Sequence, residues 1–410
     1  MNKEMKKVPT VRFKGFTDDW EQRKFSELYR KSSEKNDGSI GMNKNITVAT
    51  MKYKENVKVS TKEYLKTYYT FKIGDIAFEG HQSKEFKFGR FVENDIGDGI
   101  VSHIFSVFRP ITDYDLHFWK YAINNEALMQ RILSRCTKAS TMMHDLVLED
   151  FLREHFMVPS LKEQKQIGTY LNNLDNLITL HQRKLDQLQT LKNYCLQNMF
   201  PAKGEKAPAI RLKGFMDDWK QHKLGELLTF RNGFNGNSQQ YGSGIPLISV
   251  MDILNNNFIF SDLIRSKAAL NETEIKRYAV HYGDVLFQRS SETAEDAGTS
   301  NVYLDSQNIA VFGGFVICGR KIGDYDPVFL KYLLDSNKIR RQIVIRAQGA
   351  QHVNVSQDTL KDISIDLPSM SEQKMIGAHL YNLDNLITLQ QRKLDQLQSL
   401  KKFMLQNLFI

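Results

Sequence analysis

The sequence predicts a mixed α and β (α+β) protein in which two globular domains are separated by two long helices, packed as an antiparallel coiled coil with pseudo-two-fold symmetry. A segment of 40 residues occurs twice, at 161–200 and 370–409, and 28 of the 40 positions are identical without a gap. A shorter opening phrase also recurs, as RFKGFTDDW at 12–20 and RLKGFMDDW at 211–219. The stretches between these repeats are mostly dissimilar. The chain is therefore a tandem duplication in which the opening phrase and the long segment are retained, while the sequence between them differs.

The composition is that of an ordinary globular protein, with 41% apolar and 25% charged residues in a chain of 410. This length allows two or three domains, each with its own core. The first residues contain no apolar run typical of a secretory signal, and the longest uncharged apolar stretch, 308–319, is too short to cross a bilayer. Cys136, Cys195 and Cys318 lack the spacing of metal ligands and are expected to be reduced, buried thiols. We expect a cytoplasmic protein without membrane contacts.

The formal net charge of +9 suits an acidic partner such as nucleic acid. Its distribution weakens that argument, because residues 21–160 hold 21 basic against 19 acidic side chains and residues 220–369 hold 16 of each. Local clusters, rather than bulk charge, must therefore mark any contact with nucleic acid.

Both copies of the long repeat are predicted to be helices. Each begins with an S-x-x-E capping box directly after a proline, at Ser160–Glu163 and Ser369–Glu372. Apolar residues then recur in alternating steps of three and four, which is the 3.5-residue seam of a coiled coil. The seam consists of Leu171, Leu174, Ile178, Leu185, Leu188, Cys195 and Met199 in the first copy, and of Leu380, Leu383, Ile387, Leu394, Leu397, Met404 and Leu408 in the second.

Polar residues interrupt this seam at equivalent places in both copies, at His181 or Gln390 and at Lys192 or Lys401. Such residues cost stability but can fix the register of a helix pair. A second apolar row widens the stripe and indicates a further contact, either with a globular domain or with another protein. This row consists of Leu177, Leu180, Leu191 and Tyr194. A helix over 163–199 would be about 55 Å long, which matches roughly one and a half turns of duplex DNA.

The two inserts are predicted to share an order of elements although their residues differ. Each has a Gly-Asp turn with a strand, a further strand, a helical stretch and a closing strand before the long helix. The predicted ranges are 71–78, 100–108, 116–134 and 154–158 in the first insert, and 281–287, 309–318, 328–345 and 363–367 in the second.

The candidate ligand-binding residues lie in polar loops at matched places in the two inserts. One loop follows each Gly-Asp strand, and a second polar patch precedes each closing strand. Arg pairs well with guanine, Gln and Asn with adenine, and Lys with phosphate. The first insert contributes His81, Gln82, Lys84, Lys87, Arg90, Lys138, Ser140 and Thr141, and the second contributes Gln288, Arg289, Ser290, Gln348, Gln351, His352 and Asn354. Further phosphate contacts are expected from Lys52, Lys54 and Lys58 and from Arg340, Arg341 and Arg346.

Catalytic signatures are absent from the sequence. It contains no Asn/Asp-Pro-Pro-Tyr/Phe motif for methylation of a base amino group and no phosphate-binding loop. The EQK phrases at 163–165 and 372–374 resemble half of a nuclease motif, but they fall in the first helical turn, where an acidic residue favours the helix dipole. We therefore expect no catalytic residues and no metal site.

The duplicated helix EQK…LDNLITLHQRKLDQLQTLK, the R-F-K-G-F…W opening of each half and the divergent inserts together resemble the specificity subunit of type I restriction–modification systems. The resemblance covers the whole chain. It implies two target recognition domains that read the halves of an asymmetric bipartite site in double-stranded DNA. It also implies that the helices set the spacer and dock two methyltransferase subunits, which restriction subunits then join. S-adenosylmethionine, ATP and Mg²⁺ would act in those partners, with no cofactor bound directly here.

This resemblance predicts a division into five segments. They are a first recognition domain with its N-terminal arm at 1–160, a central helix at 161–200, a linker at 201–210, a second recognition domain at 211–369 and a C-terminal helix at 370–410. Two alternatives remain open, a stand-alone pseudo-dimeric DNA-binding regulator and an assembly scaffold that does not touch DNA. The scaffold alternative is supported by the near-neutral charge of the inserts.

Overall fold

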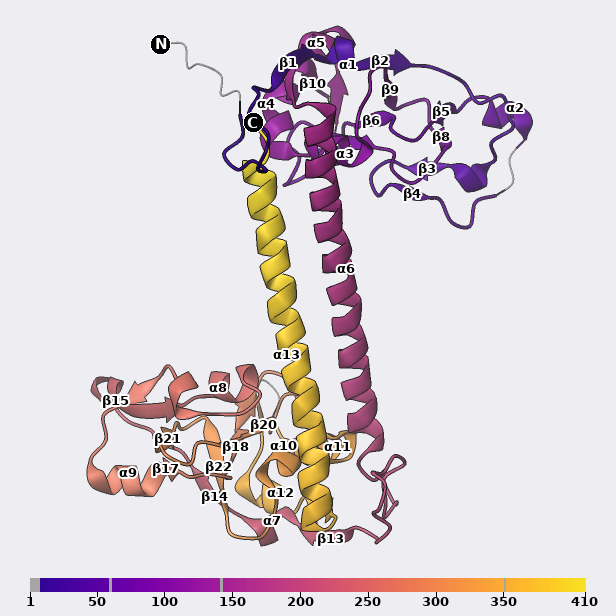
Figure 1. The fold of residues 1–410 in the computed structure, drawn as a ribbon. Coiled ribbons are helices and arrows are strands. Elements are labelled where there is room, and N and C mark those ends of the chain that lie inside the picture. The colour runs from indigo at the N-terminus through magenta and orange to yellow at the C-terminus, as the bar shows by residue number, and fades with distance from the viewer. Residues whose placement is uncertain (1–7, 59–60, 141–142, 350–351) are drawn as a thin grey trace. The chain divides into compact units, whose positions relative to one another are not determined.

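A computed structural model describes residues 8–58, 61–140, 143–349 and 352–410 (Figure 1). The chain divides into two compact units, Met1–Gln182 with Arg392–Ile410, and Arg183–Gln391. Each unit holds one globular domain together with part of both long helices, α6 (Leu161–Asn198) and α13 (Met370–Asn407). The predicted mixed fold with two domains and two long helices is confirmed.

The first domain is built around a four-stranded antiparallel sheet in the order β2-β9-β6-β7, with the two-stranded pairs β1-β12, β3-β4, β5-β8 and β10-β11 around it. Its elements are β1 (Glu21–Lys24), α1 (Phe25–Leu28), β2 (Tyr29–Ser32), η1 (Met42–Lys44), β3 (Ile46–Thr47), β4 (Lys52–Tyr53), α2 (Lys62–Leu65), β5 (Tyr69–Phe71), β6 (Ile76–Glu79), β7 (Arg90–Glu93), β8 (Gly99–Val101), β9 (Ser106–Pro110), α3 (Leu116–Ile123), α4 (Glu126–Cys136), β10 (Thr137–Ala139), β11 (His144–Leu146), α5 (Leu148–Arg153) and β12 (His155–Val158).

The second domain repeats this plan with the sheet β14-β22-β18-β20 and adds a second four-stranded sheet, β16-β15-β21-β17. Its elements are β13 (Lys220–Lys223), α7 (Leu224–Leu227), β14 (Leu228–Asn232), η2 (Ser238–Gln240), β15 (Tyr241–Ile248), α8 (Val250–Asn255), η3 (Ser261–Leu263), β16 (Lys267–Ala268), α9 (Glu272–Tyr278), β17 (Ala279–Val280), β18 (Val285–Gln288), β19 (Ser290–Ser291), β20 (Ser300–Val302), β21 (Ala310–Phe312), β22 (Val316–Lys321), α10 (Pro327–Asp335), α11 (Asn337–Arg346), β23 (Val353–Asn354), α12 (Gln357–Lys361) and β24 (Ser364–Leu367).

Several predicted elements are divided in the structure. The helical stretch at 116–134 is two helices, α3 and α4, because the Asn125 side chain accepts a hydrogen bond from the Ala127 amide and starts a new helix. The stretch at 328–345 also divides, at Ser336, whose backbone is extended and whose hydroxyl donates to the Leu333 carbonyl instead of capping the new helix. The predicted strands at 100–108 and 309–318 are each two strands separated by a turn.

The Gly-Asp turn has the same structural role in both domains. The glycine adopts a positive φ in each case, 83° and 87°, which favours glycine over other residues. The aspartate is buried and pairs with an arginine at the end of the neighbouring strand, Asp75 with Arg109 and Asp284 with Arg320, at 2.9 and 2.8 Å. This pair fixes the start of the strand from which each candidate loop departs.

The repeated opening phrase meets the start of the long helix in each half. Arg12 donates two hydrogen bonds of 2.8 Å to the buried carboxylate of Glu163, and a third to the Asp18 carbonyl. Arg211 binds Glu372 with the same distances. These contacts confirm the structural interpretation of the EQK phrases.

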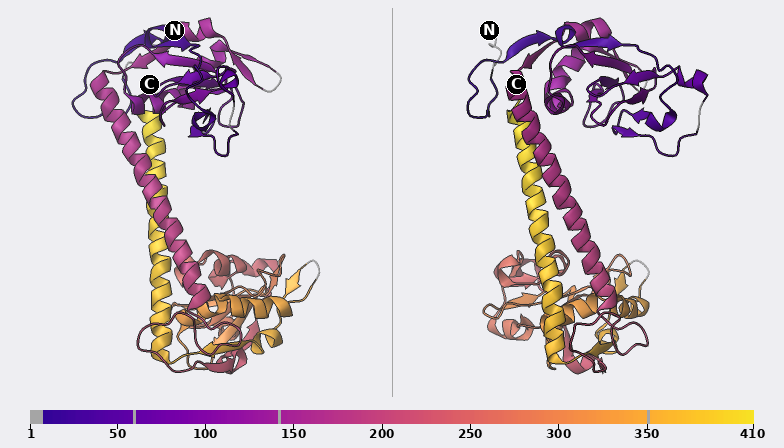
Figure 2. Two further views of the ribbon diagram at one scale, coloured as in Figure 1. Left: turned by 90° about the vertical axis from the view of Figure 1, so that its right-hand side faces the viewer. Right: turned by 45° about the vertical axis from the view of Figure 1, so that its right-hand side comes forward.

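In each unit α6 and α13 lie side by side (Figures 1 and 2). Leu171 and Leu174 join Leu397 in one buried cluster of the first unit, while Leu380 and Leu383 join the end of α6 in the second. Of the fourteen seam residues, ten are buried and four are half-buried. The buried ones are Leu171, Leu174, Leu185, Cys195, Met199, Leu380, Leu383, Leu394, Leu397 and Leu408, and the half-buried ones are Ile178, Leu188, Ile387 and Met404.

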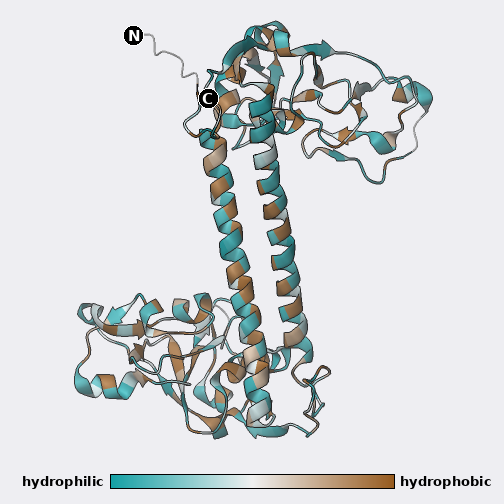
Figure 3. Ribbon diagram, in the orientation of Figure 1, coloured by the Kyte–Doolittle hydropathy of each residue, from teal (hydrophilic) through white to brown (hydrophobic). Residues whose placement is uncertain are grey.

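The direction of pairing is antiparallel within the second unit. Lys192 of α6 forms an ion pair with Asp384, and Cys195, further along α6, approaches the earlier residue His379 of α13. The apolar stripe of each helix is visible in Figure 3. The helices therefore contribute directly to both globular cores.

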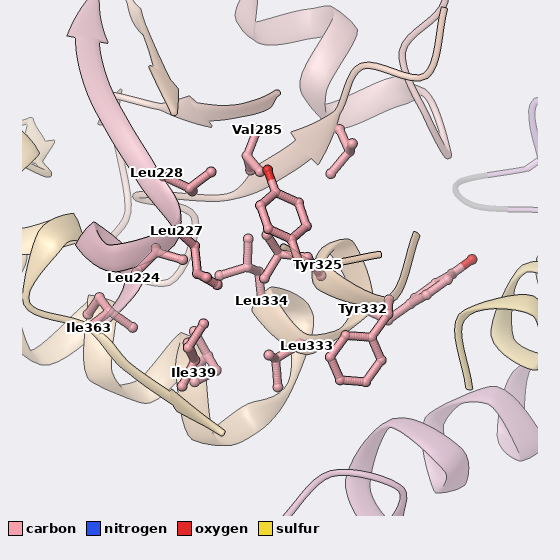
Figure 4. Packing of buried hydrophobic residues seen from close by; sticks show 14 of the residues in the cluster. Leu224, Leu227, Leu228, Val285, Tyr325, Tyr332, Leu333, Leu334, Ile339 and Ile363 are labelled. Carbon is pink, nitrogen blue, oxygen red and sulfur yellow. The ribbon is translucent and has the colours of Figure 1, made fainter. Parts of the chain in front are cut away.

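The core of the second domain is the larger one, and part of it is shown in Figure 4. Leu228 and Val285 from the sheet belong to the same cluster as Leu333, Leu334 and Ile339 from α10 and α11. All three cysteines are free and buried, as predicted. Among the described residues, no helix has the length and apolar character needed to span a membrane, and no group of side chains is arranged to hold a metal ion.

Candidate nucleic-acid interface

The structure brings together the two polar patches that the sequence placed far apart in the first domain. The His144 amide donates to the Gly80 carbonyl at 2.8 Å, which joins the β10–β11 hairpin to the loop after β6. Gln82 Nε2 and His144 Nδ1 lie 2.8 Å apart, and His81 pairs with Met143 as an isolated bridge. The loop over 80–90 and the hairpin therefore form one surface.

Arg90 holds this surface together and is less available to a ligand than the sequence suggested. Its Nε donates to Glu79 at 2.8 Å and its Nη2 donates to the Ala49 carbonyl at 2.7 Å. Its guanidinium also lies over the Phe86 ring. Because Ala49 belongs to the turn between β3 and β4, Arg90 ties that hairpin to the candidate loop.

The remaining predicted residues of the first domain are exposed cations and polar groups. Within the described part of the chain, none of the predicted lysines of this surface forms an ion pair. They are Lys52, Lys54, Lys84, Lys87 and Lys138. Ser140 donates to the Met143 carbonyl, and Thr141 lies outside the described residues. These unpaired cations are suited to phosphate contacts.

The corresponding patches of the second domain also meet. Ser290 of β19 is paired with Asn354 of β23, and their side chains are hydrogen-bonded. The Val355 amide donates to the Arg289 carbonyl at 3.0 Å, and Gln348 exchanges backbone hydrogen bonds with Asn354. The loop after β18 and the segment before α12 thus form one surface, while Gln351 lies outside the described residues.

A polar recess of about 290 Å³ opens on this surface. Its lining contains two arginines and several amide and hydroxyl groups but no acidic residue. The lining residues are Asn232, Arg289, Ile317, Arg346, Gln348, Asn354, Val355, Ser356, Gln357 and Thr359. An arginine-rich recess with amide groups suits base edges or phosphates.

Gln288 lines a neighbouring recess of about 420 Å³ together with His352 and Ser290. Its side chain is buried and its Nε2 donates to the Ser290 carbonyl at 2.9 Å. Its Oε1 has no hydrogen-bond partner among the described residues. A buried acceptor without a donor costs about 1–3 kcal/mol, and this oxygen is enclosed by the protein.

Some predicted residues do not belong to this surface. Arg340 is largely buried and donates to the carbonyls of Glu295 and Ala297 at 2.6 and 2.8 Å. Burial lowers the pKa of Arg340. It therefore holds the loop that contains Glu295 and Ala297, and this role makes its guanidinium less available for the predicted phosphate contact.

Sequence reasoning also missed residues. Asn232 and Thr359 line the recess, but they belong to β14 and α12, which are distant from the candidate loops in sequence. Only the pairing of β14 with β22 places Asn232 there, since it lies opposite Ile317 in that register. No local signal in the sequence marks either residue.

The fold resembles solved structures of one class of protein. The crystal structure of the type I restriction–modification S subunit from M. genitalium aligns with 98% of this chain and 99% of its own, with a TM-score of 0.57 and 14% identity. A structure from a study of the assembly and conformational transition of a type I restriction–modification system aligns with 94% of this chain and 96% of its own, with a TM-score of 0.52 and 17% identity.

The chain belongs to the family described as type I restriction modification DNA specificity domain, which matches residues 17–190 and again residues 216–399. The MjaVIII specificity subunit of Methanocaldococcus jannaschii is 24% identical over 257 residues, or 60% of this chain and 59% of that protein. The StySPI specificity subunit of Salmonella potsdam is 26% identical over 243 residues, 53% of this chain and 48% of that protein. The aligned part spans less than two thirds of these relatives.

Proposed function

We propose that this chain is the DNA-recognition subunit of a type I restriction–modification complex and that it acts without catalysis. The observation that carries the proposal is the recurrence of one arrangement in two dissimilar domains. In each, the loop after the Gly-Asp strand meets the segment before the closing strand and forms a polar surface. Domains with a common frame and different surfaces suit a target whose halves differ in sequence.

The side chains divide into two kinds of contact. The exposed lysines of the first domain, such as Lys84 and Lys138, would position the duplex through its phosphates. Arg289 and Asn354 would contact base edges in the second half-site. Recognition of this kind needs no catalytic residue, metal or cofactor in the chain itself.

The long helices would set the spacer between the half-sites. Each contains 38 residues, and a continuous helix of that length measures about 57 Å. Since duplex DNA rises about 3.4 Å per base pair, an unread spacer within roughly one and a half turns of duplex fits this proposal.

The helices also offer a surface to partner proteins. The second apolar row is exposed on α6 and at every equivalent position on α13. Large exposed apolar groups at regular helical spacing mark protein interfaces. The row consists of Leu177, Leu180, Leu191 and Tyr194 on α6, and of Leu386, Leu389, Leu400 and Phe403 on α13.

Because the row occurs twice, it supports two equivalent docking surfaces, one for each of two methyltransferase subunits. Restriction subunits would join this assembly. S-adenosylmethionine, ATP and Mg²⁺ would then be used by the partners, and a methyltransferase would extrude the target adenine to modify it.

Co-expression with the cognate methyltransferase subunit and mapping of methylated adenines tests the proposal. We expect methylation at a bipartite, asymmetric sequence with a fixed spacer. Replacing residues 211–369 by the equivalent domain of a relative should change one half-site only. A change in both halves, or methylation without sequence preference, would refute modular recognition.

A gel shift distinguishes the two other possibilities. A stand-alone regulator would bind its DNA tightly without a methyltransferase, and a scaffold would bind none in either case. We expect a shift that needs the methyltransferase and weakens as the salt concentration rises.

A further inference from the structure

Each domain strongly exposes a large apolar side chain beside its candidate surface. Ile104 is 71% exposed in the first domain, and Phe315 is 70% exposed in the second. Leaving a side chain of this size in water forgoes about 1.5–3 kcal/mol of burial free energy. Single exposed apolar residues are common on protein surfaces. Exposure alone therefore does not indicate a function for Ile104 and Phe315, and their position in the fold has to be considered.

Both residues occupy the same structural position. The third residue of β6 is paired with Ser106, and the third residue of β18 is paired with Ile317, in equivalent antiparallel registers. Ile104 precedes Ser106 by two residues, and Phe315 precedes Ile317 by two. The match is hidden in the sequence because the two domains are dissimilar around it.

The backbone holds both side chains in tight turns at the end of the sheet where the candidate loop begins. The Phe105 amide donates to the Ser102 carbonyl at 3.1 Å, and the Val316 amide donates to the Gly313 carbonyl at 2.9 Å. In the second domain the Arg289 amide also donates to the Phe315 carbonyl at 2.9 Å. The side chains are therefore presented by ordered backbone rather than by a loose loop.

The surroundings of Phe315 are polar. It lines the recess that also contains Ser290 and His352 and the acidic Glu292 and Asp296, and it is linked through its carbonyl to Arg289. Phe and Ile are among the side chains that proteins insert between base pairs, where they partly unstack one step of the duplex. An apolar tip beside polar groups that can reach base edges fits that use.

We propose that Ile104 and Phe315 are apolar wedges, each inserting at one base step of the half-site read by its own domain. The inference rests on the proposed function, since it requires the two surfaces to contact duplex DNA. Partial unstacking at that step would lower the cost of extruding a neighbouring base by a partner methyltransferase. The wedges would add no phosphate contact, because neither side chain carries charge.

Fluorescence of 2-aminopurine measures local unstacking and tests the proposal. The full complex with methyltransferase subunits is bound to duplexes that carry the mapped methylation site, with 2-aminopurine placed in turn at each position. We expect increased fluorescence at one step in each half-site. Phe315→Ala should abolish the increase in the second domain's half only, and Ile104→Ala in the first domain's half only.

Affinity gives a second measurement. Each alanine variant should bind about tenfold more weakly, which corresponds to about 1.4 kcal/mol, with an unchanged dependence on salt because no phosphate contact is lost. Phe315→Leu should keep the fluorescence signal, since leucine also serves as a wedge. Met216→Ala is the matched control, because Met216 is an exposed apolar residue in the opening phrase of the second half.

The outcomes separate the wedge from the proposed function. Specific DNA binding with no fluorescence change at any position, or loss of signal in both halves from one variant, would overturn the wedge and leave DNA recognition intact. Absence of any sequence-specific binding by the complex would overturn both.

Discussion

Single buried polar residues maintain the frame shared by the two dissimilar domains. Asp75 and Asp284 are almost completely buried, and each binds an arginine from the neighbouring strand. Burial raises the pKa of both carboxyl groups, while the arginine and backbone donors act in the opposite direction. The two domains therefore contain equivalent ion pairs although the surfaces around these pairs differ.

Glu93 on β7 is a different case, because it is buried without compensation. Neither of its carboxylate oxygens has a hydrogen-bond partner among the described residues. Burial, reinforced by the charge of Asp95, raises the pKa of Glu93 well above its ordinary value of 4.5. The folded state therefore holds this proton more tightly than the unfolded state does. Between pH 4.5 and the raised pKa, the contribution of Glu93 to stability therefore falls as the pH rises.

Glu93→Gln tests this residue by removing the titration. We expect the melting temperature to fall less between pH 5 and pH 8 in the variant than in the original chain, as measured by thermal unfolding at both values. Glu85→Gln, at an exposed position of the same domain, is the control. Identical pH dependence in the original and the Glu93 variant would show that Glu93 does not contribute.

At the scale of the helices, the lysines that interrupt the apolar seam have a specific role. Lys401 binds Asp175 and Lys192 binds Asp384, each on the other long helix. The same aspartates accept hydrogen bonds of 2.6 Å from tyrosine hydroxyls of the globular domains, at Tyr121 and Tyr332 respectively. Each unit thus contains a Tyr–Asp–Lys group that links its domain to both helices.

These two groups differ in burial, and this difference gives a prediction. The Asp384 side chain is 4% exposed, whereas that of Asp175 is 30% exposed. Lys192→Ala leaves a buried carboxylate without its cation and should cost about 3 kcal/mol. Lys401→Ala leaves a partly hydrated carboxylate and should cost about 1 kcal/mol or less.

Hydrogen exchange at rising urea concentration measures the stability of each unit separately in these variants. The second unit should lose protection in Lys192→Ala well before the first unit does in Lys401→Ala. Equal losses, or a larger loss for Lys401→Ala, would contradict the argument from burial.

At the scale of the whole molecule, the chain has two candidate surfaces and two apolar rows. Leu180 and Leu389 occupy equivalent positions in the rows, and both are 60% exposed. Neither globular domain covers them. We therefore expect one methyltransferase subunit to bind for each apolar row.

Leu180→Asp or Leu389→Asp should each remove one methyltransferase subunit from the complex, and the double variant should remove both. The mass of the complex in sedimentation equilibrium measures this directly. The isolated chain should stay equally stable, because the leucines are exposed. Gln189→Asp, at an exposed polar position of α6, is the control. Retention of two subunits by the double variant would place the docking surface elsewhere.

The duplication, the long helices with their capping boxes, the apolar seam and the matched loops could all be recognised in the amino-acid sequence alone. These features are local or periodic, and helix and turn chemistry acts over a few residues. Which polar residues lie side by side became evident only from the three-dimensional fold. Sheet register brings Asn232 to the recess, buries the Gln288 side chain and places Ile104 and Phe315 at one common position. Contacts between residues far apart in the chain depend on how strands pair. The sequence of each insert contains no local pattern that reveals this pairing.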